Sequence, residues 1–229
     1  MNQQRGYLKV EKLTGHTYLN HELLCQALTH SSYTNENKQV YYEDYERLEF
    51  LGDAVLELTT SEFLYMNHPE MREGNMTKMR ASLVCESTLA SCARKIGLEK
   101  YILFGKGEEQ TGGRNRDSII SDVMEAVIGS LYLDGGIEVA KRFIYQCVLD
   151  HYEDKILFYD SKTILQERVQ EKGRSLSYEL VDECGPAHDR TYKVNCMINK
   201  KKVSEGSGRT KKGAEQEAAY QALLILNEK

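Results

Sequence analysis

The spacing of apolar residues changes from helical to strand-like near residue 160, which limits the chain to two differently built parts. Before this point, apolar side chains recur every three or four residues, as amphipathic helices require. The segments with this spacing are 19–29, 43–66, 76–96, 118–133 and 137–152. Residues 105–116 are predicted to form a polar loop between helices. Because no strand pattern interrupts these segments, the first part is predicted to be all-α.

The second part shows a different order of elements. A short amphipathic helix is expected at 162–172, and a longer helix at 211–226. Three strand-like runs lie between them, at 177–184, 190–198 and 202–208. The middle run alternates, placing Tyr192, Val194, Cys196 and Ile198 on one face. The sequence therefore predicts an all-α domain over residues 1–155, followed by an α+β domain of order α-β-β-β-α over residues 160–229.

Charge is also divided between the two parts. Residues 1–159 contain 17 basic and 24 acidic residues, a net charge of −7, whereas residues 160–229 contain 13 and 11, a net charge of +2. The overall net charge of −5 argues, by itself, against a nucleic-acid-binding protein. Because the two parts differ in sign, each must be considered separately.

Membrane and secretion signals are not apparent in the sequence. No apolar run is long enough to cross a bilayer, and residues 1–12 lack the apolar centre of a signal peptide. The cysteines form no C-x-x-C pair and have no zinc-finger spacing, so they are predicted to be small buried hydrophobes in a reducing compartment. They are Cys25, Cys85, Cys92, Cys147, Cys184 and Cys196. A cytoplasmic protein without membrane association is predicted.

The segment 46–56 places three acids on one helical face. Glu46, Glu49 and Asp53 are three and four residues apart, and like charges at these spacings repel each other. A divalent cation would turn that repulsion into coordination, whereas a solvated acidic face is the open alternative. A second face, formed by Leu48, Leu51, Val55 and Leu58, is predicted to be buried. Gly52, a poor helix former, indicates close approach by another backbone.

A second acidic pair lies in an apolar helix. Asp122 and Glu125 are three residues apart, and a carboxylate pair in a mostly buried helix is costly unless it binds a cation. Two such helices facing each other would form an oxygen-rich site suited to Mg²⁺, with Mn²⁺ as a plausible substitute. No His or Cys belongs to the group, which argues against zinc. Bound Mg²⁺ could activate a water and stabilise the leaving oxygen of a phosphodiester.

Several sequence blocks resemble the ribonuclease III family. The blocks are 46–56, Asp122-x-x-Glu125-Ala, Gly129-x-x-Tyr132-Leu133-Asp134, 27–33 and 105–108. The similarity covers nearly the whole chain, including a double-stranded-RNA-binding domain after the nuclease domain. It implies an endoribonuclease that hydrolyses double-stranded RNA with Mg²⁺.

The resemblance also implies roles for particular residues. Glu49, Asp53, Asp122 and Glu125 correspond to the catalytic carboxylates. All of these except Asp53 would ligate Mg²⁺ directly, and Asp53 would position water. Glu46 and Glu73 match acids that line the same cleft.

The same resemblance implies a homodimer through the nuclease domain, with each subunit cutting one strand and leaving short 3′ overhangs. Ribosomal RNA precursors, messenger RNA and regulatory duplexes are the expected substrates. Two positions depart from the family pattern. Tyr45 occupies a position where the family commonly has Asn, and Asn75 one where it often has an acid. Neither change removes a predicted metal ligand. His30 is interpreted as a structural histidine at helix ends rather than a general base.

Recognition of an A-form duplex depends on its shape, phosphates and 2′-hydroxyls. Gln166 on the first helix could bond a 2′-hydroxyl, and His188 in the turn at 185–188 could enter the next minor groove. Thr210 is a predicted N-cap, which places Lys211 and Lys212 in the first turn of the last helix. Cations there oppose the helix dipole unless an anion such as phosphate arrives.

Two alternatives to an active nuclease remain. One is a non-catalytic double-stranded-RNA-binding protein or chaperone, which the intact set of four carboxylates disfavours. The other is a scaffold that binds Mg²⁺ only for stability, which the basic second part disfavours. The sequence favours a Mg²⁺-dependent endoribonuclease.

Overall fold

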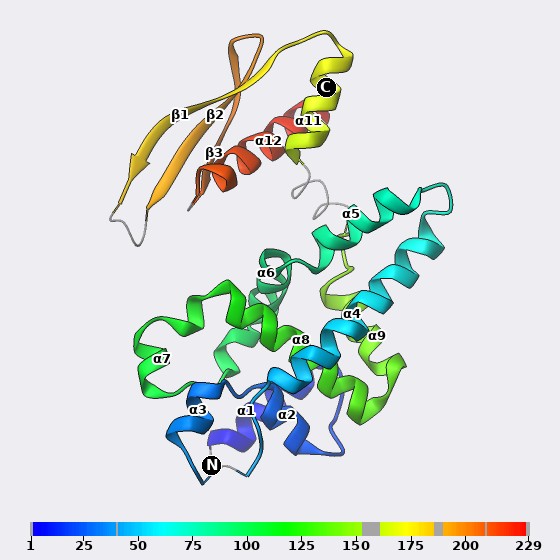
Figure 1. The fold of residues 1–229 in the computed structure, drawn as a ribbon, viewed down its shortest axis with the longest axis vertical. Helices are drawn as coiled ribbons and strands as arrows, with labels where there is room; N and C mark the ends of the chain where they lie inside the picture. The colour runs from blue at the N-terminus through cyan, green and yellow to red at the C-terminus, as the bar shows by residue number, and fades with distance from the viewer. Residues whose placement is uncertain (1, 40, 153–160, 186–189, 209, 228–229) are drawn as a thin grey trace. The chain divides into compact units, whose positions relative to one another are not determined.

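The computed structural model describes residues 2–39, 41–152, 161–185, 190–208 and 210–227, which fall into two compact units, Met1–Tyr152 and Glu153–Lys229 (Figure 1). The described elements of the first unit are helical, apart from one isolated bridge between Thr29 and Leu103. They are α1 (Asn2–Thr14), α2 (His21–Ala27), α3 (Ser31–Glu36), α4 (Glu46–Asn67), α5 (Glu73–Val84), α6 (Glu86–Ile96), η1 (Leu98–Tyr101), α7 (Lys106–Gln110), η2 (Gly113–Asn115), α8 (Asp117–Gly135) and α9 (Ile137–Cys147).

Helix α8 forms the centre of the first unit. Side chains on nearly all its faces are buried, including Ile120, Met124 and Ile128, which are fully enclosed. Helices α2, α4, α6 and α9 pack around it, and Figure 1 shows α4, in cyan, crossing α8, in green. This central position explains why residues 118–133 are so apolar, and it makes the two carboxylates within that stretch, Asp122 and Glu125, exceptional.

Two predicted boundaries in the first unit are wrong. The single helix expected at 76–96 is two helices, because the backbone of Cys85 is extended, with φ −70° and ψ 154°. The loop expected at 105–116 contains α7 and η2. Helix α7 begins here because the Glu36 carboxylate accepts hydrogen bonds from the backbone N–H groups of Lys106 and Gly107. An acid from a distant segment therefore stabilises a helix start.

Helices α1 and α3 are absent from the predicted elements. Helix α1 is mostly polar in sequence, and among residues 7–14 only Val10, Glu11 and Thr14 are buried, so no extended apolar stripe indicated it. Helix α3 has only six residues and no buried side chain. Short helices of this kind depend on tertiary contacts rather than on their own sequence.

The second unit consists of α11 (Ser161–Glu171), an antiparallel sheet of order β1-β2-β3, and α12 (Lys211–Asn227). The strands are Leu176–Cys184, Thr191–Ile198 and Lys201–Gly208. The predicted alternation in β2 is confirmed, because Val194, Cys196 and Ile198 are buried and Tyr192 is half-buried. The core joins both helices to the sheet. The predicted fold class, all-α followed by α-β-β-β-α, is confirmed.

Glycines allow α12 to lie close to β3. A Cβ atom at Gly206 would be 2.2 Å from the backbone nitrogen of Ala218, and one at Gly208 would be 2.7 Å from that of Ala214. Alanines face these glycines from the helix, so the two backbones approach without intervening side chains. This contact fixes the start of α12 against the end of the sheet.

The cysteine prediction is partly wrong. None of the six cysteines, all of them within the described residues, is in a disulfide, and Cys25, Cys92 and Cys196 are buried, but Cys184 is exposed near the end of β1. Among the described residues, no helix combines the length and the hydropathy that a membrane span requires.

Candidate active site and RNA-binding surface

The predicted acidic faces meet where α4 crosses α8. A Cβ atom at Gly52 would lie 1.8 Å from the backbone oxygen of Glu125, and one at Gly129 would lie 2.2 Å from that of Leu48. Only glycine permits this approach, so the close contact predicted at Gly52 is confirmed. Since Gly52 directly precedes Asp53, the crossing brings acids of both helices to one site.

Helix α4 contributes a row of acids that runs along the crossing. Glu46 and Asp53 are exposed, and Glu49 is half-buried between them. Burial, followed by the negative charges of neighbouring acids, raises the pKa of Glu49 to about 7. Those neighbours are Asp122, Glu46 and Asp53. The acids of α4 therefore interact electrostatically with one another and with Asp122 on α8.

Helix α8 contributes two half-buried carboxylates. Burial, with added repulsion from other acids, raises the pKa of Glu125 to about 8. The acids responsible are Asp53, Asp122, Glu49 and Glu57. Burial also raises the pKa of Asp122, although a hydrogen bond from Tyr45 opposes this shift. The structure thus brings Glu49, Asp53, Asp122 and Glu125 together with Glu46.

Glu57 belongs to this acidic group but was not predicted. It lies one turn beyond Asp53 on α4, and its charge raises the pKa values of both Asp53 and Glu125. Its spacing of four residues from Asp53 could have predicted that it lies on the same helical face. Glu86, at the start of α6, also raises the pKa of Asp122, and only the fold brings it near.

The donor set suits a hard divalent cation. Burial, followed by repulsion between the acids, raises the pKa values of Glu49 and Glu125, and a bound cation would favour their charged forms. Within the described ranges, no three His, Cys, Asp or Glu side chains already stand together as ligands. Uncompensated carboxylates have no electrostatic reason to converge. The chemistry of these carboxylates therefore fits Mg²⁺, and the role of each carboxylate stays a prediction.

Glu73 and Asn75 lie elsewhere in the unit. Glu73 is exposed at the start of α5, where its carboxylate accepts a hydrogen bond from Thr77. It lines a groove between α4 and α5 and is not among the groups that shift the pKa values of the four carboxylates. Asn75 is exposed two residues later. Within one chain, the described contacts do not bring Glu73 to the predicted cleft.

His30 has the structural role that was predicted. Its Nδ1 accepts a hydrogen bond from the backbone N–H of Ser32 at 3.1 Å and is 2.8 Å from the Ser32 hydroxyl, so it caps α3. Its ring lies 5.4 Å from that of Phe104 and 5.8 Å from that of Tyr45. The prediction of a histidine at a helix end is confirmed.

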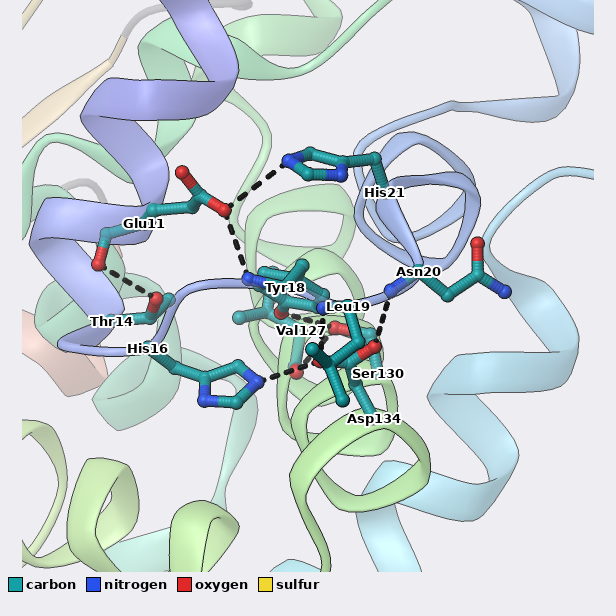
Figure 2. Close-up of polar contacts among 10 residues, drawn as sticks. All are labelled: Glu11, Thr14, His16, Tyr18, Leu19, Asn20, His21, Val127, Ser130 and Asp134. Atoms are coloured by element: carbon teal, nitrogen blue, oxygen red, sulfur yellow. Dashed lines mark hydrogen bonds and ion pairs between the residues drawn. The ribbon is translucent and has the colours of Figure 1, made fainter.

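A polar network fixes the far end of α8 (Figure 2). The Asp134 carboxylate accepts hydrogen bonds from the backbone N–H groups of Leu19 and Asn20 and lies 2.7 Å from His16 Nε2. The Tyr18 hydroxyl lies 2.7 Å from the Ser130 hydroxyl. Figure 2 shows the segment between α1 and α2 crossing the end of α8. This network holds the helix that carries the acidic pair.

Several large apolar side chains on α4 face solvent. They are Phe50, Leu58, Tyr65 and Met66, with exposed fractions of 83%, 62%, 71% and 71%. The prediction that Leu58 is buried is therefore wrong for a single chain. Large apolar side chains that gather on one exposed element can mark an interaction surface.

The predicted RNA-binding residues lie mainly on helices of the second unit. Gln166 is half-buried on α11, and Lys211 and Lys212 are exposed at the start of α12. The Thr210 hydroxyl accepts a hydrogen bond from the backbone N–H of Gly213 at 3.0 Å, which confirms the predicted N-cap. His188 lies outside the described residues.

The lysines at 200–202 lie at the β2–β3 turn. Asn199 and Lys200 have φ angles of 50° and 63°, as in a two-residue hairpin turn. Lys202 pairs with Glu205 at 2.7 Å. Helix α12 starts soon after the opposite end of β3, so these lysines form a separate basic group.

Comparisons with known proteins agree with this arrangement. Residues 20–152 match the model of a Ribonuclease-III-like family, and residues 161–226 match that of a double-stranded RNA binding motif. Ribonuclease 3 of Bacillus licheniformis is 50% identical over 91% of this chain and 85% of its own length. Ribonuclease 3 of a Staphylococcus aureus strain is 48% identical over 93% of this chain and 89% of its own.

A solved structure of the nuclease domain of ribonuclease III from Campylobacter jejuni is similar to the first unit. It is 36% identical, has a TM-score of 0.58, and aligns with 63% of this chain and 97% of its own. The two family models match the two units in the order in which they occur along the chain. By the extent of these matches, the chain belongs to the ribonuclease III family.

Proposed function

We propose that this chain, a double-strand-specific endoribonuclease of RNA processing, uses the carboxylates at the α4–α8 crossing to cut RNA with Mg²⁺. The observation that carries the proposal is the backbone contact at Gly52 and Gly129, which gathers acids with mutually raised pKa values. Such crowding is unfavourable in a purely structural helix pair. It becomes useful when a cation neutralises the charges.

The proposed roles follow from the position of each acid. Glu49, Asp122 and Glu125 would hold Mg²⁺ through carboxylate oxygens, because all three are half-buried and the charges of Asp122 and Glu49 raise the pKa of Glu125. Asp53 is more exposed and accepts a hydrogen bond from the attacking water. Glu46 lines the cleft of its own chain, whereas Glu73, in the groove between α4 and α5, would line a cleft only in the homodimer proposed below. When bound, Mg²⁺ supplies charge stabilisation to the phosphodiester and activates water.

Homodimerisation through the first unit is part of the proposal. The exposed apolar residues Phe50, Leu58, Tyr65 and Met66 all lie on α4, which also carries the acidic row. The similar Campylobacter jejuni structure concerns a region involved in dimer formation of its nuclease domain. A second copy of the chain would cover these side chains and place a second acidic site nearby. Each site would then cut one RNA strand, and the two cuts would leave short 3′ overhangs.

The second unit is proposed to hold the duplex. Lys211 and Lys212 would bind phosphates at the start of α12, Gln166 would bond a 2′-hydroxyl, and His188 would enter the next minor groove. We assign residues 1–155 to the nuclease domain and 160–229 to the RNA-binding domain. Ribosomal precursors, messenger RNA and regulatory duplexes are the proposed substrates, in the cytoplasm. A non-catalytic RNA-binding protein is not favoured.

The metal proposal can be tested without RNA. Mn²⁺ titrated into the wild-type protein and monitored by electron paramagnetic resonance should bind, and Glu125→Gln should weaken binding at least about tenfold. Glu138→Gln, which removes an exposed acid from α9, is the matched control and should leave binding unchanged. Equal affinity in all three proteins would contradict the proposed site.

A further inference from the structure

Tyr45 lies at the junction between α3, α4 and α8. It immediately precedes α4, its side chain is 5% exposed, and its backbone N–H donates to the Thr29 oxygen at 3.0 Å. Its ring lies 5.8 Å from the His30 ring, which is itself held by the capping bonds to Ser32. Tyr45 therefore has a fixed backbone and a packed ring.

The Tyr45 hydroxyl reaches across to α8. It lies 3.4 Å from Oδ2 of Asp122, a carboxylate 77 positions away in the sequence. A phenol is protonated at neutral pH, so the hydroxyl donates and the carboxylate accepts. The separation is longer than an ordinary O–H···O bond, as is common among catalytic side chains.

We infer that Tyr45 is a positioning residue that orients Asp122 for metal binding by donating a hydrogen bond to one of its oxygens. The inference rests on the Mg²⁺ binding proposed above. The phenol contacts Oδ2 of Asp122, and with its rotamer restrained in this way the carboxylate would be held ready to bind the cation. Because the phenol is neutral, it restricts the Asp122 rotamer without supplying a positive charge that would compete with the metal ion. Groups that hold a ligand in this way commonly tune metal affinity.

The geometry explains why the restraint is useful at Asp122. Asp122 is half-buried, and the negative charge of Glu86 repels it. A repelled carboxylate on a helix can turn to another rotamer, away from the cation. The rigid support behind Tyr45, from the Thr29 oxygen and the His30 ring, opposes that rotation.

Tyr45→Phe tests the inference because it keeps the ring and removes only the hydroxyl. The matched control is Tyr18→Phe, which removes a buried hydroxyl that lies 2.7 Å from Ser130, also on α8 but at its other end (Figure 2). Mn²⁺ affinity is measured by electron paramagnetic resonance at neutral pH, together with Tm. Steady-state cleavage of a defined RNA duplex gives kcat and KM over a range of Mg²⁺ concentrations.

Tyr45→Phe should weaken Mn²⁺ binding about tenfold and lower kcat at limiting Mg²⁺, with kcat restored by excess Mg²⁺ and KM for RNA unchanged. Tyr18→Phe should lower Tm but leave Mn²⁺ affinity unchanged. Equal Mn²⁺ affinity in Tyr45→Phe and the wild type would overturn the role of Tyr45 while leaving the metal site intact. Failure of the wild type to bind Mn²⁺ would overturn both proposals.

Discussion

The two units each gather like charges, but in opposite structural settings. The acids of the first unit are crowded between two helices whose backbones touch at glycine, so their protonation is shifted. The lysines of the second unit are exposed at a helix start, where water surrounds them. The acidic site therefore depends on backbone packing and on a cation, whereas the basic site depends on charge and salt alone. Substitutions in the two units should therefore separate RNA cleavage from RNA binding.

The largest expected effect is the loss of cleavage in Glu125→Gln. Removing a metal ligand should cost about 4 kcal/mol of transition-state stabilisation, or roughly a thousandfold in rate. Binding of double-stranded RNA, measured by gel shift in chelator, should stay within about twofold of wild type, because that free energy comes from the basic unit. Glu46→Gln, from the rim of the same group, should reduce the rate far less. Equal loss of binding and cleavage in a folded Glu125→Gln protein would contradict the separation.

The next effect concerns stability at the crossing. Gly52→Ala places a Cβ against the backbone of α8 and should destabilise the first unit by about 3 kcal/mol or more. Gly74→Ala is the matched control, because a Cβ added at that helical glycine would have no other atom within 4 Å. It should stabilise the protein by about 1 kcal/mol through helix propensity. Thermal unfolding measures both variants, and a Tm for Gly52→Ala at or above wild type would mean that the helices do not touch there.

The basic unit should respond to salt rather than to metal. Lys211→Ala/Lys212→Ala should lower the slope of log affinity against log salt by about two, roughly one unit for each phosphate contact. Lys200→Ala/Lys201→Ala changes the net charge equally at the β2–β3 turn and should alter the slope less. Fluorescence anisotropy over a salt series distinguishes the pairs. An unchanged slope in the first variant would remove these lysines from the RNA-binding surface.

The last effect is a pH dependence of stability that arises in the acidic unit. Burial and neighbouring acids raise the pKa of Glu49 to about 7 and that of Glu125 to about 8, from an ordinary value of 4.5. Between the ordinary and the raised pKa values, the folded state therefore binds more protons than the unfolded state. Stability in chelator should therefore fall as pH rises from about 5 to 8, and Mg²⁺ should restore it at pH 8. Glu125→Gln should reduce the difference in Tm between pH 5 and pH 8. An identical pH profile for wild type and Glu125→Gln would contradict the proposed crowding.

Local pattern predicted most of the second unit and the main helices of the first. Alternation over residues 190–198 placed β2 to within one residue, and three- and four-residue spacing placed Glu49 and Asp53 on one face. These features depend on neighbours in the sequence. The close helix contact at Gly52 could be predicted because glycine is unfavourable inside a helix unless another backbone approaches it. In the structure, that backbone is the one at Glu125.

The features that could not be predicted depend on residues far apart in the chain. Tyr45 was identified only as a departure from a family pattern, because its partner Asp122 is 77 positions away. The Glu36 carboxylate that starts α7 is 70 positions from Lys106. The break at Cys85 leaves the helical spacing on both sides intact, so periodicity alone could not reveal it. Such contacts become visible only once the helices are packed.

Metal-dependent cutting of RNA is tested most directly by cleavage of a long labelled RNA duplex by the purified full chain, with Mg²⁺ or with excess chelator, beside a DNA duplex of the same sequence. We predict cutting of the RNA duplex only, and only with Mg²⁺. Cutting in chelator, or RNA binding without cutting when Mg²⁺ is present, would contradict the proposed mechanism.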